Sequence, residues 1–408
     1  MIQDGGAAHV RVAGALANDS PCGSAWYSPN SVSDQYELVP YTEDLTPAVK
    51  AFNQRLLRGG IDKKLMYPEM SVPRFPPNEG ARVFQQYFLL ADARREVRGG
   101  FILTQEQWSF RGEPAWVAHL RLPISEGAVD RNFKAVGPQV FHSAITTQPN
   151  LYTVGMGGFE TAVTKRLKSL GWSMRAVPFY FKLLRPGVFL KTSPYLQKSS
   201  LLGRTAKLVA GTGLGSLGVG AFRVLSTLYA PRMVNVSVEE VAAFGDWTDE
   251  IWECSHRSFH LIAPRDSRTL TLRYPAEERQ FLKLKFSRQG KAIGWALVLD
   301  TKMRGNNYFG DARVGTIVDC LADPSDASKI ICGATSYLCD RGVDLVVSNH
   351  THRNWRDGFC RAGFLRGPSN YVFALSPEIA KRVEPFDANF GGFFVSRGDG
   401  AGPERLME

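Results

Sequence analysis

One succession of segments occurs twice in this chain, and this repeat limits the possible folds more than any single motif does. Each occurrence predicts a strand, a helix, a strand, a helix that closes in Gly plus an aromatic residue, and a final strand. In the first copy the segments are 116–125, a helix from Gly137, 151–158, a helix ending at Gly171-Trp172 and 177–181. In the second copy they are 314–323, 329–342, 343–352, a helix ending at Gly363-Phe364 and 370–375. Because solenoid repeats are only about 20–50 residues long, this much longer period predicts two copies of one domain.

Length and composition agree with two domains. The chain has 408 residues, 44% of them hydrophobic and 22% charged, which is enough for two ordinary globular domains with their own cores. We expect five parts: a flexible leader over 1–34, a first domain over 35–190, a Gly-rich apolar linker helix over 191–232, a second domain over 233–380 and a C-terminal tail over 381–408. The proline-rich stretch 67–80 predicts a long loop that acts as a lid or a binding loop.

Charge and cysteine usage bear on partners and compartment. The formal net charge of +10 favours phosphate-bearing ligands, nucleic acid or an anionic membrane surface, or is simply the charge of a basic soluble surface. The six cysteines show neither C-x-x-C pairs nor metal-ligand spacing, so we expect reduced thiols, no metal site and a cytoplasmic location. The first 20 residues lack the pattern of a secretory signal.

The linker has an unusual apolar centre. Residues 208–222 carry no charge and contain five glycines, at 211, 213, 215, 218 and 220. The stretch is shorter than the roughly 20 apolar residues that a membrane span requires. Two interpretations remain: a buried or inter-domain linker helix, and a segment over 205–229 that contacts the surface of the inner membrane with the help of nearby basic residues.

This order of elements, with Gly-aromatic helix ends, resembles the fold of GNAT-type acyltransferases over about 36–190 and 234–378. The resemblance implies an α/β (α+β) protein with two tandem GNAT-like domains, each a mixed, mostly antiparallel sheet flanked by helices. The second half is also similar to GNAT-like proteins encoded in bacterial exopolysaccharide gene clusters. The phrases that carry this similarity are GWALVLD, VGTIVDCLADP, GVDLVVSN, GFLRGPSNYVFA and RGDGAGP.

The GNAT resemblance implies acyl-CoA as co-substrate. In that fold the fourth and fifth strands splay apart around acyl-CoA, and its pyrophosphate binds backbone N–H groups at the start of the next helix. The usual loop is Q/R-x-x-G-x-G/A, and in the first copy Gly137 matches it, with Arg131, Lys134 and Val136 beside it as the other predicted cofactor-binding residues. The alternative is that Gly137 only begins a helix. In the second copy the matching stretch, 323–328, has two acidic residues and no glycine, so we expect no standard CoA site there.

Candidate catalytic residues concentrate in the second copy. Asn349, His350 and His352 directly follow a strand, at the sheet edge where open α/β folds present ligands, and histidine can act as the general base that amine acylation needs. The alternative is a polar turn in which Asn349 or Thr351 caps a helix.

Asp319, on the fourth strand of the same copy, is the other candidate, because GNAT enzymes often draw their base from this strand. The alternative is a strand-end carboxylate paired with Arg313 or another basic residue. Glu106 and His119 lie on neighbouring strands of the first copy and could play the same part, or be ordinary residues of a sheet face.

Three functions are compatible with these features. The leading hypothesis is an acyltransferase that moves an acyl group from acyl-CoA, held by the first copy, to an amine acceptor recognised by the second, such as a sugar or lipid-linked sugar in exopolysaccharide biosynthesis. A second is Fem-type transfer from aminoacyl-tRNA, against which the lack of a charged helical hairpin argues; specific nucleic-acid binding is otherwise not expected. A third is a non-catalytic pseudo-GNAT module that binds a partner at the membrane. Oligomeric state stays open, and Arg397 and Asp399 are expected either to fold back on the domain interface or to belong to a mobile tail.

Overall fold

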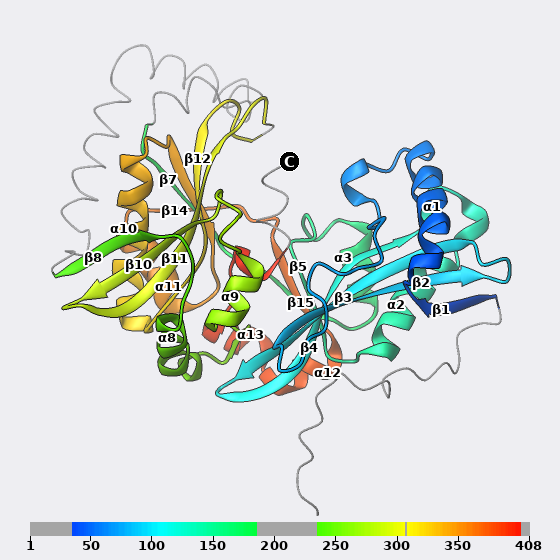
Figure 1. Cartoon of the computed structure of the whole chain (residues 1–408), viewed down its shortest axis with the longest axis horizontal. Coiled ribbons are helices and arrows are strands. Elements are labelled where there is room, and N and C mark those ends of the chain that lie inside the picture. Colours follow the sequence, from blue (N-terminus) through cyan, green and yellow to red (C-terminus); the bar gives the residue numbers. More distant parts are fainter. Residues whose placement is uncertain (1–34, 186–234, 307, 401–408) are drawn as a thin grey trace, which may run out of the picture.

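The computed structural model describes residues 35–185, 235–306 and 308–400, which form two twisted sheets with helices packed against them (Figure 1). The first sheet has the strand order β1-β2-β3-β4-β5-β15-β6, and β3 also contacts the short pair β9 and β16. The second has the order β14-β7-β13-β12-β11-β10-β8. The strands of the first sheet are β1 (Tyr36–Pro40), β2 (Val83–Asp92), β3 (Val97–Phe110), β4 (Glu113–Ser125), β5 (Leu151–Val154), β6 (Ser173–Ala176), β9 (Leu261–Ile262), β15 (Val372–Leu375) and β16 (Phe393–Phe394). Those of the second are β7 (Phe179–Leu183), β8 (Val236–Val241), β10 (Leu282–Arg288), β11 (Lys291–Lys302), β12 (Arg313–Ala322), β13 (Leu345–Asn349) and β14 (Leu365–Gly367).

Most neighbouring strands are antiparallel, whereas β4 with β5, β12 with β13 and β9 with β16 are parallel. The main helices are α1 (Thr46–Arg58), α2 (Val136–Thr147), α3 (Ala162–Ser169), α8 (Trp247–Ser255), α9 (Ser267–Arg273), α10 (Ala327–Asp340) and α11 (Arg353–Arg361). The predicted fold class, two mixed and mostly antiparallel sheets flanked by helices, is therefore confirmed.

The two sheets exchange a strand. β7 comes from the first half of the chain but lies between β13 and β14 of the second sheet, with Phe181 opposite Val347. β15 comes from the second half but lies between β5 and β6 of the first sheet, with Phe373 opposite Val154. The predicted division at 35–190 and 233–380 follows chain order, and neither sheet is built from one of these ranges alone.

The Gly-aromatic helix ends form as the sequence predicts. Gly171 has φ 77° and Gly363 has φ 79°, a left-handed conformation that glycine adopts without a steric penalty. In each case the next amide donates to a carbonyl five residues earlier, Trp172 to Leu167 at 3.2 Å and Phe364 to Phe359 at 3.0 Å. The turn brings the aromatic side chain back against its own helix and sheet, so both halves close this unit alike.

Two segments adopt a structure other than the one that their local sequence favours, which is a turn at Gly99-Gly100 and a helix from residue 237. Gly99 and Gly100 do not form a turn but lie inside β3, where Cβ atoms would come within 2.9 Å of a Val136 methyl carbon and of the Tyr67 ring, respectively. The stretch 237–241 is not the start of a helix but most of β8, because pairing with β10 overrides its local propensity.

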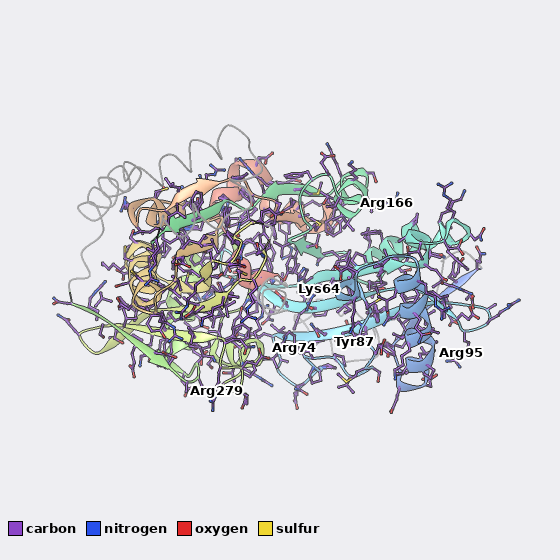
Figure 2. The ribbon with its side chains drawn as sticks, turned by 90° about the horizontal axis from the view of Figure 1, so that it is seen from above. Lys64, Arg74, Tyr87, Arg95, Arg166 and Arg279 are labelled. Atoms are coloured by element: carbon purple, nitrogen blue, oxygen red, sulfur yellow. The ribbon has the colours of Figure 1, made fainter. Side chains whose placement is uncertain are left out.

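The proline-rich loop at 67–80 connects the two halves. Arg74 lies 3.0 Å from the carboxylate of Glu278, and Arg268 donates a hydrogen bond to the carbonyl oxygen of Glu79 at 2.9 Å. Figure 2 shows Arg74 at the junction of the two sheets. The loop is therefore held against the second half rather than projecting from the first.

The last described residues also lie between the sheets. We call Phe393–Gly400 the C-terminal segment. It begins with β16, which pairs with β9, and continues through a bridge between Ser396 and His350. The side chain of Asp399 is fully buried, so the expectation that Arg397 and Asp399 fold back on the interface is confirmed.

The predicted leader 1–34 and linker 191–232, including the proposed membrane-surface segment 205–229, lie outside the described residues. Among the helices within residues 35–185, 235–306 and 308–400, none is both long enough and apolar enough to cross a membrane.

Candidate active site

The parallel strands β4 and β5 are paired at only two positions. Ala118 pairs with Leu151 and His119 with Tyr152, after which β4 runs on to Ser125 while β5 pairs with β15 on its other side. β4 also carries one extra residue relative to β3 near Leu122, which has φ 49°. The first sheet therefore opens beyond His119, as the GNAT resemblance implied.

The four predicted cofactor-binding residues gather at the start of α2. Arg131 and Lys134 are exposed in the turn that precedes the helix, and Gly137 lies against Ser125 at the end of β4. Val136 is fully buried, backbone included. Ala135, at the N-cap position, provides no side-chain hydrogen bond, so no cap competes for the first amides of α2. Whether this helix start binds CoA stays a prediction.

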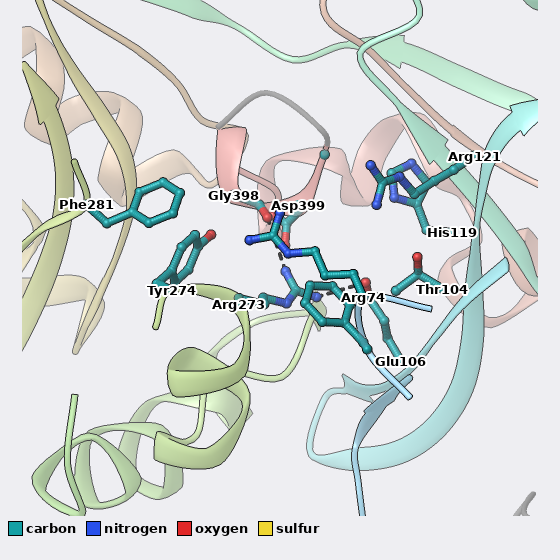
Figure 3. A pocket seen from close by; sticks show the side chains of 12 residues that line it. Arg74, Thr104, Glu106, His119, Arg121, Arg273, Tyr274, Phe281, Gly398 and Asp399 are labelled. Atoms are coloured by element: carbon teal, nitrogen blue, oxygen red, sulfur yellow. Dashed lines mark hydrogen bonds and ion pairs between the residues drawn. The ribbon is translucent and has the colours of Figure 1, made fainter. Parts of the chain in front are cut away.

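A hollow lies between the two halves, next to the point where β4 and β5 separate (Figure 3). Its empty space and the solvent at its open mouth together amount to about 460 Å³, so the hollow itself is smaller than this. In Figure 3, side chains from β3 and β4 approach from one side and those from α9 and the following loop from the other. The lining residues are Arg74, Phe75, Thr104, Glu106, His119, Arg121, Arg273, Tyr274, Phe281, Gly398, Asp399 and Gly400.

His119 occupies the last paired position of β4 and faces this hollow. Its ring stacks on Tyr152 with centroids 4.6 Å apart. Burial, reinforced by the positive charges of Arg121 and Arg273, holds the pKa of His119 well below its usual value of 6.5. The imidazole is therefore neutral near pH 7 and has a lone pair that can accept a proton.

Glu106 and Arg273 form an ion pair across the two halves, 2.8 Å apart. Trp108 donates a hydrogen bond to the other oxygen of Glu106 at 2.7 Å, and Arg273 donates one to the carbonyl of Gly398 at 3.1 Å. Burial is the largest influence and acts to lower the pKa of Arg273, but Glu106, Tyr274, Tyr152 and Asp399 together outweigh it, so the net direction is upward and the guanidinium stays charged. Glu106 is thus a partner of Arg273 and is not free to act as a base without losing that contact.

The second sheet opens in the same place, but the chain itself fills the opening. β12 and β13 pair over three positions, from Val314 with Leu345 to Thr316 with Val347. Beyond them the C-terminal segment lies between the strands: Ser396 donates to Asp319 at 2.8 Å, and Thr351 donates to the carbonyl of Phe393 at 2.5 Å.

At the start of α10, the Asp326 carboxylate lies 2.7 Å from Arg288 and 2.6 Å from Lys329.

Asp319 is bound on all sides. It receives hydrogen bonds from Arg265, from Ser396 and from the amide of Cys320, and its side chain is only 2% exposed. Arg265 also donates to Asp399 at 2.8 Å. Burial raises the pKa of Asp319, while the guanidinium of Arg265 acts in the opposite direction. The structure therefore shows the alternative, an ion pair with a basic residue: the partner of Asp319 is Arg265, whereas Arg313 pairs with Asp300.

The other predicted catalytic residues also have partners in the interior. The Asn349 side chain donates to the carbonyls of Val177 and Pro178 and accepts a hydrogen bond from Arg397 at 2.8 Å. Asp319, Asn349, His350 and His352 all lie outside the hollow's lining, and each is at most 4% exposed. Their catalytic role stays a prediction, without an accessible cavity to support it.

Both histidines are neutral and packed among aromatic rings. His350 stacks on Trp355 and meets the edge of Phe394, and its Nδ1 accepts from the amide of His352 at 3.2 Å. Burial holds the pKa of His350 well below 6.5 and, with Arg353 and His260, lowers that of His352 to about 4. No group of three or more His, Cys, Asp or Glu side chains in the described residues is placed to bind a metal ion.

Sequence reasoning did not identify Arg74, Arg121, Arg273 and Tyr274 as parts of one site. Glu106 and His119 could be predicted as neighbours, because β3 and β4 are consecutive antiparallel strands whose side chains alternate between the two faces of the sheet. Arg273 lies at the end of a seven-residue helix in the other half, and no local pattern relates it to Glu106.

No family model matches this chain, and no curated protein matches it. Solved structures resemble it in shape. N-myristoyltransferase of Saccharomyces cerevisiae with bound myristoyl-CoA is 10% identical, with a TM-score of 0.49, over 86% of this chain and 84% of that one. A GCN5-related N-acetyltransferase from Anabaena variabilis is 10% identical, with a TM-score of 0.48, over 83% and 72%. A tandem GNAT protein from the clavulanic acid biosynthesis pathway is 11% identical, with a TM-score of 0.45, over 84% and 98%. With TM-scores below 0.5, these likenesses carry no functional conclusion for this chain.

Proposed function

We propose that this protein is an N-acyltransferase that moves an acyl group from acyl-CoA to an amine, with its reaction site on the first sheet. The observation that carries the proposal is the position of His119. It lies where β4 and β5 separate and also faces the hollow between the halves. A donor in the opening and an acceptor in the hollow would meet beside this neutral imidazole.

The opening suits the donor. Beyond His119, the backbone N–H and C=O groups of β4 that face β5 have no partner on that strand. Buried backbone groups need hydrogen-bond partners, and the amides of the pantetheine arm of CoA would supply them. The pyrophosphate would lie at the start of α2, where the amide of Gly137 and the exposed charges of Arg131 and Lys134 favour an anion.

The chemistry needs one proton acceptor. The amine nitrogen attacks the thioester carbonyl, a C–N bond forms and the C–S bond breaks, the nitrogen loses a proton and CoA leaves as the thiolate. We assign the proton to His119, because its depressed pKa leaves the imidazole neutral at pH 7. The same depression makes it a weak base, so proton transfer would accompany collapse of the tetrahedral intermediate, in which the nitrogen is acidic.

Finer parts of the proposal rest on sequence alone. These are a sugar or lipid-linked sugar as acceptor, a role in exopolysaccharide biosynthesis, a cytoplasmic location and contact with the inner membrane through 205–229. The alternative of a non-catalytic module is favoured by one observation, the filled opening of the second sheet, which affects only that half.

Isothermal titration with acetyl-CoA and longer acyl-CoAs tests the proposal. We expect binding by the wild type and about tenfold weaker binding by Lys134→Glu, since a charge-assisted contact is worth about 1.5 kcal/mol or more. Lys168→Glu, the same charge change on the exposed face of α3, is the matched control and should bind as the wild type does. If no acyl-CoA binds, the enzymatic proposal fails and the non-catalytic module takes its place.

A further inference from the structure

We propose that the amine acceptor carries an anionic group, a phosphate or a carboxylate, and that arginines of the hollow between the halves bind it. We call Arg74, Arg121 and Arg273 the arginine triad; all three line the hollow, and they come from the 67–80 loop, β4 and α9. The inference rests on the proposed function and concerns the acceptor part of the same site.

The charges of the hollow are arranged so that the positive ones face its space. The side chains of Arg74 and Arg273 are 35% and 11% exposed, whereas those of Glu106 and Asp399 are 3% and 0% exposed. Both carboxylates accept hydrogen bonds from protein groups: Glu106 from Trp108, and Asp399 from Arg265 through both of its oxygens. Among the lining residues, the side chains of Arg74 and Arg273 are therefore more exposed than the two carboxylates, and Arg74 also pairs with Glu278, which is 31% exposed.

Arg273 is fixed in a position to bind an anion. Its Nη1 donates to the Gly398 carbonyl, and its Nη2 lies 2.8 Å from Glu106. Both contacts are made within the protein, and they hold the guanidinium in place at the wall of the hollow. A side chain that is already held in place loses little freedom when it binds a ligand. The group stays charged, since the pKa of Arg273 is shifted upward.

The remaining walls suit a small organic body attached to that anion. Tyr274 and Phe281 meet edge to face, with centroids 5.1 Å apart, and Phe75 forms another apolar wall. His119 faces the same hollow. An acceptor with its anion at the arginine triad could present its amine toward His119, which lies beside Arg121 in Figure 3. Guanidinium groups bind phosphate and carboxylate alike through paired N–H donors, so both chemistries fit.

Three small amines that share a two-carbon arm provide the test: ethanolamine, O-phosphoethanolamine and β-alanine. Dissociation constants are measured by ligand-observed NMR titration of the full chain, at low and at raised salt. We expect O-phosphoethanolamine or β-alanine to bind about tenfold more tightly than ethanolamine, with the difference shrinking as salt rises. Whichever anionic amine binds better shows whether the group is a phosphate or a carboxylate.

Arg74→Gln and Arg121→Gln remove one guanidinium each, and thermal unfolding verifies that each variant folds. We expect at least one of them to reduce the preference for the anionic amine to twofold or less, while Arg361→Gln, an exposed arginine on α11 outside the hollow, retains it. Equal binding of all three amines, binding of none, or a preference kept by both triad variants overturns the inference. Because these titrations need neither acyl-CoA nor turnover, their failure is distinct from failure to bind acyl-CoA.

Discussion

Arg265 and Asp399 fix the C-terminal segment between the two sheets: Nη2 of Arg265 lies 2.8 Å from one carboxylate oxygen of Asp399 and 2.9 Å from the other. Neither side chain is more than 2% exposed. The same guanidinium contacts Asp319 on β12, so one buried cation joins the C-terminal segment to the second sheet. Gly398 and Asp399 in turn line the hollow beside β3 and β4, which makes this cluster a support for the candidate active site.

Replacing Arg265 with Met should destabilise the protein strongly. It would leave two buried carboxylates without their cation, a loss on the order of 3–5 kcal/mol. Arg95→Met is the control: Arg95 lies at the far end of the first half (Figure 2) and pairs with Asp44 through side chains 74% and 60% exposed. Exposed pairs contribute about 1 kcal/mol or less. Thermal unfolding followed by circular dichroism compares the two, and equal losses would contradict the structural role of Arg265.

Gly398→Ala should also be costly. A Cβ atom at this position would lie 2.7 Å from Oδ2 of Asp319, and the carboxylate cannot move away without losing Arg265. Overpacking of this kind costs about 1–3 kcal/mol. Gly391→Ala is the matched control, since a Cβ there has no neighbour within 4 Å. The midpoints of thermal unfolding should fall for Gly398→Ala alone, and an unchanged midpoint would mean that the C-terminal segment is not packed against Asp319.

The order of elements could be predicted from the sequence because each signal is local. The Gly-aromatic helix ends at Gly171 and Gly363 depend on a left-handed backbone conformation, which glycine favours and which can therefore be predicted from the residue type. The strand exchange is not local. β7 and β15 are both short, apolar strands, and nothing in their pattern states which sheet they join. Only the register with β13 and β5 decides this.

The candidate site was predictable only in part for the same reason. Glu106 and His119 belong to consecutive strands, so their proximity follows from one hairpin. The polar run that contains His350 and His352 suggested an accessible site, because polar residues after a strand usually face solvent. Here Phe394 of the C-terminal segment covers His350, a tertiary contact that the sequence of the run itself does not encode.

The two halves should not fold alone. Fragments divided between residues 210 and 211 would each lack an interior strand of one sheet, leaving the edges of β5 and β6, or of β13 and β14, unpaired. We expect each fragment to show poor chemical-shift dispersion in NMR spectra, and the co-expressed pair to copurify and unfold cooperatively. A single fragment with a cooperative thermal transition would show that the exchange is dispensable.

Stability should fall between pH 7 and pH 5 because of His352. Its folded pKa is about 4, below the ordinary 6.5, so as the pH falls the unfolded chain binds a proton that the folded protein does not. The contribution of His352 to the free energy of unfolding is therefore complete above pH 6.5 and is lost as the pH falls toward 4. By pH 5 this loss is about 2 kcal/mol. Burial shifts the pKa of His350 in the same direction, so replacing His352 alone removes only part of the dependence.

Urea midpoints at pH 7 and pH 5 give the measurement for this pH dependence. His352→Gln should show a smaller difference between the two pH values than the wild type. His142→Gln, which alters an exposed histidine of α2, should leave the difference unchanged. An identical difference in all three proteins would mean that His352 is accessible to protons in the folded state.

Each chain should bind one molecule of acyl-CoA, not two. The repeat provides two parallel strand pairs that separate after a few positions, β4 with β5 and β12 with β13. In the second pair Ser396 already bonds to Asp319, so the C-terminal segment occupies the opening that a donor would need. Isothermal titration should therefore give a stoichiometry of one for the wild type. A stoichiometry of two would show that the C-terminal segment leaves its place when the donor binds.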